Sequence, residues 1–177
     1  MLSGWITSVV RIRILKTMNK FFFGVEKIDK ISGTAFALGY AGALPFIFLV
    51  ILQWQGYEPM QNGLNLIYFY GCIILSFLGA PHWGYILAIA DKGKTKNLAG
   101  RLVIGVIPSL IAFFSITVSE IDRLLIIGSS FIFVYVIDSI LFRQQIVPNW
   151  FLPLRLRLTL IVVMSFLFSI ILIIFRE

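Results

Sequence analysis

"LNLIYFYGCIILSFLGAPHWGYILAIA", residues Leu64 to Ala90, contains no aspartate, glutamate, lysine or arginine. An α-helix needs roughly 17–25 predominantly apolar residues to cross a bilayer, and this stretch is long enough to cross with some tilt. It also holds His82, the single histidine of the chain, between Pro81 and Trp83. The stretch therefore predicts a membrane-spanning helix with an ionisable ring inside it.

The rest of the chain has the same apolar character. Of the 177 residues, 59% are hydrophobic and 13% are charged, and the mean hydropathy is +0.97. Soluble domains are about half apolar and a quarter charged, so this composition predicts an integral membrane protein. Because the apolar stretches are continuous and do not alternate, we expect helices and not a β-barrel.

Five apolar runs predict an all-α membrane protein, a five-transmembrane-helix bundle. The expected spans are residues 31–54, 64–90, 102–118, 124–142 and 158–175. The connections between them are short, so neighbouring helices should run antiparallel. The sequence shows no internal repeat, and an odd number of spans disfavours a simple inverted-repeat transporter.

The basic residues predict the orientation of this bundle. All 15 lysines and arginines except Arg123 and Arg176 lie in the N-terminal tail and in the connections after the second and fourth spans. Since basic residues resist translocation, we expect the N-terminus inside and the C-terminus outside, and the net charge of +7 then reflects topology. Anionic lipid head groups are the expected partners of the inner loops. No basic surface interleaved with aromatic residues suggests nucleic-acid binding.

Residues 1–30 form a basic N-terminal segment with two open interpretations. The segment is rich in arginine, lysine, serine and threonine and has no acid before Glu26, which is the composition of a mitochondrial transit peptide. On a helical wheel, however, Arg11 falls opposite Arg13, so the amphipathicity is poor, and an interfacial segment is the alternative. Met18 is an alternative start, and the arginines that interrupt the apolar run disfavour a secretory signal.

The cysteine and motif content disfavours an enzyme. Cys72 is the only cysteine, so neither an internal disulfide nor a cysteine-based metal cluster is expected. The sequence has no glycine-rich phosphate loop, no metal-spaced histidine or glutamate pair and no nucleophile elbow. We therefore expect no catalytic residue, no metal site and no cofactor.

A stripe of small residues recurs every four positions in the second span. Its members are Cys72, Ser76, Ala80, Gly84 and Ala88. The first span has a similar series at Ala35, Gly39 and Ala43. In lipid, helices associate where small side chains let their backbones approach, so we expect both series to pack closely, against each other or against a shared neighbour.

His82 and Asp138 are expected at a similar depth in the membrane. The second and fourth spans run in the same direction, and these two residues lie roughly 10 Å and 8 Å from the middle of their helices toward the inside. An isolated aspartate at such a depth costs about 3 kcal/mol, so Asp138 should be neutral or paired. The candidate partners are His82 and two long side chains of the inner loop, Arg155 and Arg157. Tyr135 shares the helix face of Asp138.

Pro81 is expected to kink the second span beside His82, because proline lacks a backbone donor and disturbs the bond to the Phe77 carbonyl. Trp83 suits an aromatic belt at the inner interface. Three roles are open for His82 with Asp138. We favour a polar pair that fixes how two helices dock, ahead of a proton-relaying or ligand-binding pair. Hydrolytic catalysis is least expected, since two residues without a third make a poor active site.

Several sequence blocks occur together in a specific order. They are LGYAGALPF (Leu38–Phe46), YGCIILSFLGAPHWG (Tyr70–Gly84), IPSL (Ile107–Leu110), Asp138 and PNWFLPLRLRLT (Pro148–Thr159). In this order the chain, over roughly residues 31–175, resembles the transmembrane protein 69-like family. The resemblance implies a small polytopic protein of a proteobacterial or mitochondrial inner membrane, with a domain of unknown function and no assigned activity.

The resemblance also implies a set of family-pattern positions. These are Gly79, His82, Trp83, Gly84, Asp138, Trp150, Leu154 and Arg155. Ala80 and Pro81 depart from the pattern, which has a glycine and an aliphatic residue there, and the basic N-terminus is longer. Because of this proline, the local geometry around His82 is the feature that is least expected to follow the family pattern.

The expected function is that of a non-enzymatic integral inner-membrane protein, a subunit or assembly partner of a larger membrane complex. Other membrane protein subunits are then its partners, and the distribution of the family suggests the respiratory chain as a host. The alternative is a small proton-coupled transporter or ligand carrier that uses His82 and Asp138, with kinks at Pro45, Pro81 and Pro108. A membrane enzyme acting on lipid or quinone is the third interpretation.

Overall fold

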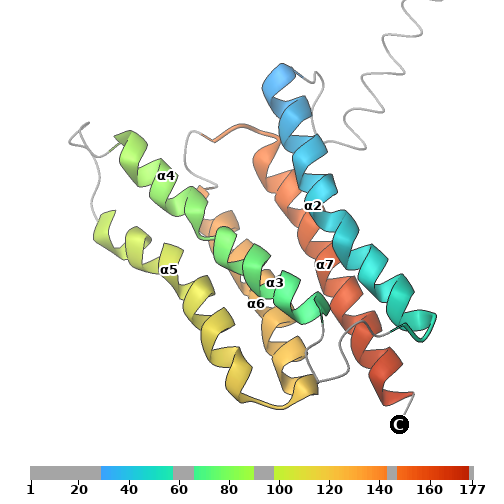
Figure 1. Ribbon diagram of the computed structural model, residues 1–177. Coiled ribbons are helices and arrows are strands. Elements are labelled where there is room, and N and C mark those ends of the chain that lie inside the picture. Colours follow the sequence, from blue (N-terminus) through green and yellow to red (C-terminus); the bar gives the residue numbers. More distant parts are fainter. Residues whose placement is uncertain (1–28, 58–65, 90–97, 143–146, 176–177) are drawn as a thin grey trace, which may run out of the picture.

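The computed structural model describes residues 29–57, 66–89, 98–142 and 147–175, and these residues form helices and no strand (Figure 1). The elements are α2 (Lys30–Trp54), α3 (Leu66–Phe77), α4 (Ala80–Ile89), α5 (Leu98–Phe114), the 3-10 turn η2 (Ser115–Thr117), α6 (Glu120–Phe142) and α7 (Phe151–Ile174). With α3 and α4 taken as one segment, five of the described segments are long and apolar enough to cross a membrane. The all-α, five-span fold predicted from the sequence is confirmed.

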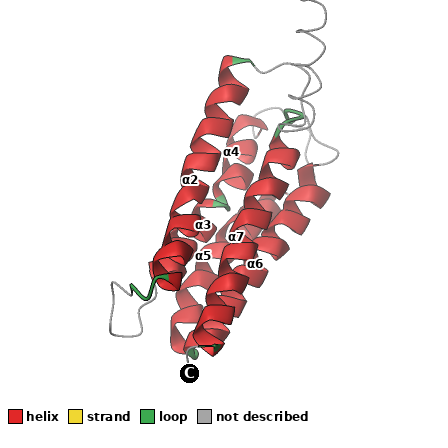
Figure 2. Ribbon diagram, turned by 90° about the vertical axis from the view of Figure 1, so that its right-hand side faces the viewer, coloured by secondary structure: helices red, strands yellow, loops and turns green. Residues whose placement is uncertain are grey.

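The helices run roughly along one common direction (Figure 2). α7 packs against both α2 and α6, while α5 packs against α3 and α4 on the other side of the bundle (Figure 1). Phe46 of α2 lies at the centre of the core, with its ring centroid 6.2 Å from that of Phe131 in α6 and 5.9 Å from that of Phe166 in α7. Because lipid tails are as apolar as these rings, close van der Waals packing holds the core together.

The second span is interrupted beside Pro81, as the sequence predicted. α3 ends at Phe77 and α4 begins at Ala80, and the amide of His82 donates to the carbonyl of Gly79 at 3.2 Å, one residue closer than in a regular α-helix. Proline is tolerated in the first turn of α4 because its missing N–H has no helical partner there. The interruption allows the two halves of the span to face different neighbours.

Gly79 makes the closest backbone approach of this break. A Cβ atom placed on Gly79 would lie only 1.9 Å from the carbonyl oxygen of Gly105 in α5. The backbones of the α4 start and of α5 are therefore in direct contact, and only glycine leaves room for them. This crossing fixes where α4 emerges, and thereby the position of His82.

Three helices begin at least four residues before the expected spans. α7 begins at Phe151 instead of residue 158, α5 at Leu98 instead of residue 102, and α6 at Glu120 instead of residue 124. The sequence suggested a loop at the start of α7 because Pro153, Arg155 and Arg157 interrupt the apolar run. Proline is however compatible with a first helical turn, and arginine is a strong helix former. Arg155 consequently belongs to a rigid helix and not to a loop.

The N-terminal end of α2 is capped by the side chains of Asp29 and Ser32. The carboxylate of Asp29 accepts from the backbone amide of Ser32 at 2.8 Å, and the Ser32 hydroxyl accepts from the amide of Asp29 at 3.0 Å. The Ser32 hydroxyl also donates to the carboxylate, and these hydrogen bonds hold the pKa of Asp29 below its ordinary value. Most of the basic segment 1–30 lies outside the described residues.

Candidate functional site

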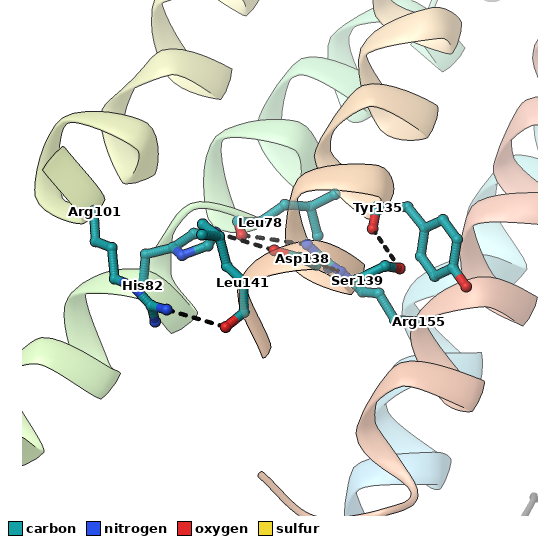
Figure 3. Close-up of polar contacts among 8 residues, drawn as sticks. All are labelled: Leu78, His82, Arg101, Tyr135, Asp138, Ser139, Leu141 and Arg155. Atoms are coloured by element: carbon teal, nitrogen blue, oxygen red, sulfur yellow. Dashed lines mark hydrogen bonds and ion pairs between the residues drawn. The ribbon is translucent and has the colours of Figure 1, made fainter. Parts of the chain in front are cut away.

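Three ionisable side chains from three helices meet in the interior of the bundle (Figure 3). Asp138 of α6 is fully buried, and its Oδ1 lies 3.0 Å from Nε2 of His82 in α4. Its Oδ2 accepts a 2.7 Å bond from Nε of Arg155 in α7. The structure thus brings together the histidine and aspartate placed at one depth by the sequence, and Arg155 is the arginine that reaches the carboxylate. We call His82, Asp138 and Arg155 the polar cluster.

The break between α3 and α4 supplies a fourth group to this cluster. In a continuous helix the carbonyl of Leu78 would accept from the amide of His82, but that amide bonds to Gly79 instead. The Leu78 carbonyl is therefore free to accept from Nη2 of Arg155, at 3.3 Å. The sequence pointed to the neighbouring carbonyl of Phe77; the structure places the guanidinium on Leu78.

Charges within the polar cluster balance. The Arg155 guanidinium and the Asp138 carboxylate cancel, so the cluster is neutral when the imidazole is neutral. A buried pair of this kind is costly to desolvate, and it is held by good geometry and by hydrogen bonds to its remaining groups. Three of the five helical segments are consequently tied at one level by charge-assisted bonds.

The imidazole of His82 has one engaged and one free nitrogen. Nε2 faces the carboxylate, so in a neutral ring Nε2 carries the proton and Nδ1 is an acceptor. Within the described part of the chain, the buried Nδ1 has no hydrogen-bond partner. The ring stacks on Phe142 of α6, with centroids 5.1 Å apart. Packing and the carboxylate together fix the orientation of the ring.

Two predicted site residues do not join the polar cluster. The Tyr135 ring points away from Asp138, and its backbone carbonyl accepts from the hydroxyl of Ser139 at 2.8 Å (Figure 3). Trp83 is 44% exposed and packs over Gly105 of α5, where an added Cβ would meet its ring at 2.6 Å. Trp83 therefore covers the α4–α5 crossing. Tyr135 shares the helix face of Asp138 in the sequence, but this did not determine where its ring points, because the rotamer and the neighbours of the side chain decide that.

The predicted small-residue stripe does not pack helices within the described part of this chain. Cys72 is partly buried, but its other members, Ser76, Ala80, Gly84 and Ala88, are exposed. A four-residue step advances about 40° beyond a full turn, so over five members the stripe rotates by about 160° around the helix. It starts on the flank that faces α5 and ends on the outer surface, where a Cβ on Gly84 would meet nothing within 4 Å.

Other glycines make the close approaches inside the bundle. A Cβ on Gly71 of α3 would lie 2.5 Å from the Phe166 ring, and one on Gly39 of α2 would lie 3.0 Å from Leu158. Gly39 belongs to the series noted in the first span, and it faces Leu158 and Leu154 of α7. Gly71 was missed because the predicted four-residue stripe contained the neighbouring Cys72 instead. Gly71 lies on the buried face of the second span, together with Leu75 and His82.

Polar contacts outside the cluster also link the helices. Arg101 of α5 donates to the carbonyl of Leu141 at 3.0 Å, near the end of α6 (Figure 3). Its guanidinium also lies 5.0 Å from the centre of the Tyr85 ring. At another level the Ser169 hydroxyl donates to Gln53 at 2.7 Å, joining α7 to α2. Arg101 was missed because it was placed in a loop. Gln53 and Ser169 could have been found as polar residues inside apolar runs.

Among the described residues, no group of three or more histidine, cysteine, aspartate or glutamate side chains could hold a metal ion. The polar cluster is built from one carboxylate, one imidazole and one guanidinium. Such a set can hold helices together, exchange a proton at His82 or donate hydrogen bonds to a neighbouring acceptor.

Comparison with known proteins gives relatives but no solved structure that matches. The sequence profile of the family described as "Protein of unknown function (DUF3429)" matches residues 31–171. The chain is 30% identical to Transmembrane protein 69 of Xenopus tropicalis, over 84% of this chain and 58% of that protein. It is also 30% identical to Transmembrane protein 69 of Mus musculus, over 75% of this chain and 53% of that protein. No solved structure matches.

The chain spans little more than half the length of these two curated relatives. The matched region covers the five apolar helices, apart from the first residue of α2 and the last three of α7, and all three residues of the polar cluster. The apolar helices and the transmembrane relatives together make this an integral, multi-pass membrane protein. The chain belongs to the DUF3429 family of proteins of unknown function and is similar to Transmembrane protein 69.

Proposed function

We propose that this protein is a non-enzymatic inner-membrane protein, a subunit or assembly partner of a larger membrane complex. The observation that carries the proposal is the outward face of α4. Ala80, Gly84 and Ala88 are exposed there, and Gly84 has open space where a side chain would be. In lipid, small residues at this spacing are the ones against which another transmembrane helix packs closely.

The arrangement of the stripe fits a partner helix that crosses α4 at an angle. Rows of residues spaced by four are inclined to the helix axis, and helices that pack along such rows cross at about −50°. A partner lying along Ser76, Ala80 and Gly84 would therefore cross α3 and α4 obliquely. Ser76, Ala80 and Gly84 are exposed, so the described helices of this chain do not cover that row.

The polar cluster supports the same proposal. Asp138 is already paired with Arg155 and His82, so it behaves as a structural staple of α4, α6 and α7. A small proton-coupled transporter is less well supported, because it would need a polar path to Asp138, and the side chain of Asp138 is fully buried. A respiratory complex is one host that a small inner-membrane subunit of this kind would suit.

Replacing Gly84 with leucine tests the proposed docking face. After mild solubilisation of the native membrane, we expect the wild-type protein to migrate in blue-native electrophoresis with other subunits. Gly84→Leu should reduce the recovered partners about tenfold, a loss of about 1.4 kcal/mol, because leucine blocks backbone approach. The matched control is Ala37→Leu, on the exposed face of α2, which should leave the complex unchanged.

Two outcomes contradict this proposal. One is a wild-type protein that runs alone under conditions in which known complexes of the same membrane stay intact. The other is a Gly84→Leu variant that keeps its partners in wild-type amount. The melting temperature of the purified variant checks its own fold and should stay close to that of the wild type, since a Cβ on Gly84 would meet nothing within 4 Å.

The orientation is the second part of the proposal. With the N-terminus inside, the basic segments before α2, between α4 and α5 and between α6 and α7 share the inner side and contact anionic lipid head groups. Epitope tags at the two ends, probed with protease in sealed membranes, should be cleaved from opposite sides, the C-terminal tag from outside. Cleavage of both tags from the same side is incompatible with five crossings.

A further inference from the structure

An apolar crevice of about 170 Å³ lies between α2, α3, α6 and α7. Gly42 of α2, Phe77 of α3 and Phe131 of α6 lie in its walls, and Arg155 and Thr159 of α7 form its polar side. The side chains of Leu38 and Phe77, which also line the crevice, are 69% and 70% exposed. The mouth of the crevice therefore opens sideways between α2 and α3, toward the lipid.

The crevice is held open by the packing of α2. This helix packs more extensively on α7 than on α3. A Cβ added to Gly42 would meet nothing within 4 Å, so the glycine backbone borders open space. The hydroxyl of Tyr70 in α3 donates to the carbonyl of Gly42 at 2.8 Å and braces the two helices beside the gap. The space is thus a preformed feature of the bundle.

Hydrogen-bond donors remain available at the polar side. Arg155 uses Nε for Asp138 and Nη2 for Leu78, which leaves Nη1 without a partner among the described residues. Thr159 is 6% exposed, and its hydroxyl makes no hydrogen bond within the same part of the chain. The Thr159 hydroxyl is not one of the fully buried polar atoms that lack a partner in this part of the chain, so it is accessible from the crevice that it lines. Ser165 of the same helix, in contrast, bonds the carbonyl four residues back at 2.8 Å. These donors suit an oxygen acceptor supplied by a ligand.

The charge of the polar cluster selects the kind of acceptor. Because Asp138 already neutralises Arg155, an anionic ligand would bring an uncompensated charge into an apolar site, whereas a neutral carbonyl oxygen would not. The volume is close to that of an engineered cavity of about 150 Å³ that binds benzene, so one six-membered ring fits. Phe46, Phe77 and Phe131 provide aromatic surfaces for such a ring.

We propose that this crevice binds the head ring of an isoprenoid quinone. The ring lies among the phenylalanines, one carbonyl oxygen accepts from Arg155 Nη1 and from the Thr159 hydroxyl, and the apolar tail leaves between Leu38 and Phe77 into the lipid. The proposal covers binding only and includes no electron transfer, because the lining residues and the hydrogen-bond donors account for binding alone. Among the described residues, none from α4 lines the crevice, so this proposal does not depend on the docking face proposed on α4.

Binding of a short-tailed ubiquinone to the purified protein in lipid nanodiscs tests the site. The wild-type protein should bind the probe and melt at a higher temperature in its presence. Gly42→Leu should weaken binding about tenfold, because its side chain fills the crevice, and Thr159→Val, nearly isosteric, should weaken it about fivefold. Gly84→Leu, outside the crevice, is the matched control and should bind like the wild type.

A second probe separates a quinone from a lipid chain. Oleate and phosphatidylglycerol are added in competition with the quinone, and both should displace it poorly. The proposal is overturned if the wild type does not bind the quinone, or if Gly42→Leu and Thr159→Val bind it as well as Gly84→Leu does. It is also overturned, in favour of an acyl chain, if oleate displaces the quinone at equal concentration and Thr159→Val has no effect.

Discussion

Replacing Asp138 with leucine is expected to lower the free energy of unfolding by about 3 kcal/mol. The substitution leaves the guanidinium of Arg155 inside the bundle without its carboxylate, since its side chain is only 11% exposed. His82 loses its partner at the same time. The loss is measured by titrating SDS into the protein in mixed micelles and following the helical signal by circular dichroism.

The matched control is Asp122→Leu, at the start of the same helix. Asp122 is exposed, and among the described residues its carboxylate accepts only from the hydroxyl of Ser119, at 2.6 Å, so its loss should cost no more than about 1 kcal/mol. If the Asp138→Leu variant is as stable as the Asp122→Leu variant, the carboxylate does not hold α4, α6 and α7 together. The polar cluster would then be incidental to the fold.

Replacing Gly79 with alanine is expected to cost about 3 kcal/mol, the upper end of the usual range for overpacking. The added methyl group would lie 1.9 Å from the carbonyl oxygen of Gly105, and a backbone atom cannot turn aside as a flexible side chain can. α4 and α5 must separate, which also moves His82 away from Asp138. The free energy of unfolding is again the quantity to measure.

Gly84→Ala is the matched control for this second prediction. It makes the same change five residues later in α4, where the new methyl group meets open space. Because alanine is the better helix former, this variant should be about 0.5–1 kcal/mol more stable than the wild type. Equal effects of the two substitutions would show that the α4–α5 crossing is not the close contact described above.

The five spans and the meeting of His82 with Asp138 could be predicted because they depend on simple, additive signals. Long apolar runs fix the number of crossings, and the basic residues fix the expected direction of each crossing, from which relative depth follows. Arg155 was found among the candidates for the same reason, as a long basic side chain at the correct end. Only its placement on a helix was not foreseen.

The face that each helix turns toward its neighbours could not be predicted. In a bundle that is apolar all round, the hydrophobic pattern does not distinguish the lipid side from the core side. The small-residue stripe from Cys72 to Ala88 was therefore expected to pack closely against other helices, whereas Gly71 and Gly79 make the actual approaches. The break at Gly79 adds to the difficulty, because it changes the rotation of α4 relative to α3.

The coupling free energy between Asp138 and Arg155 tests the central claim most directly. It requires four proteins: the wild type, Asp138→Leu, Arg155→Met and the double variant, each unfolded in mixed micelles. We expect the double variant to be more stable than Asp138→Leu, with a coupling of about 2 kcal/mol, because removing both charges leaves none unpaired. Additive effects of the two substitutions would contradict the claim that this ion pair joins α6 to α7 inside the membrane.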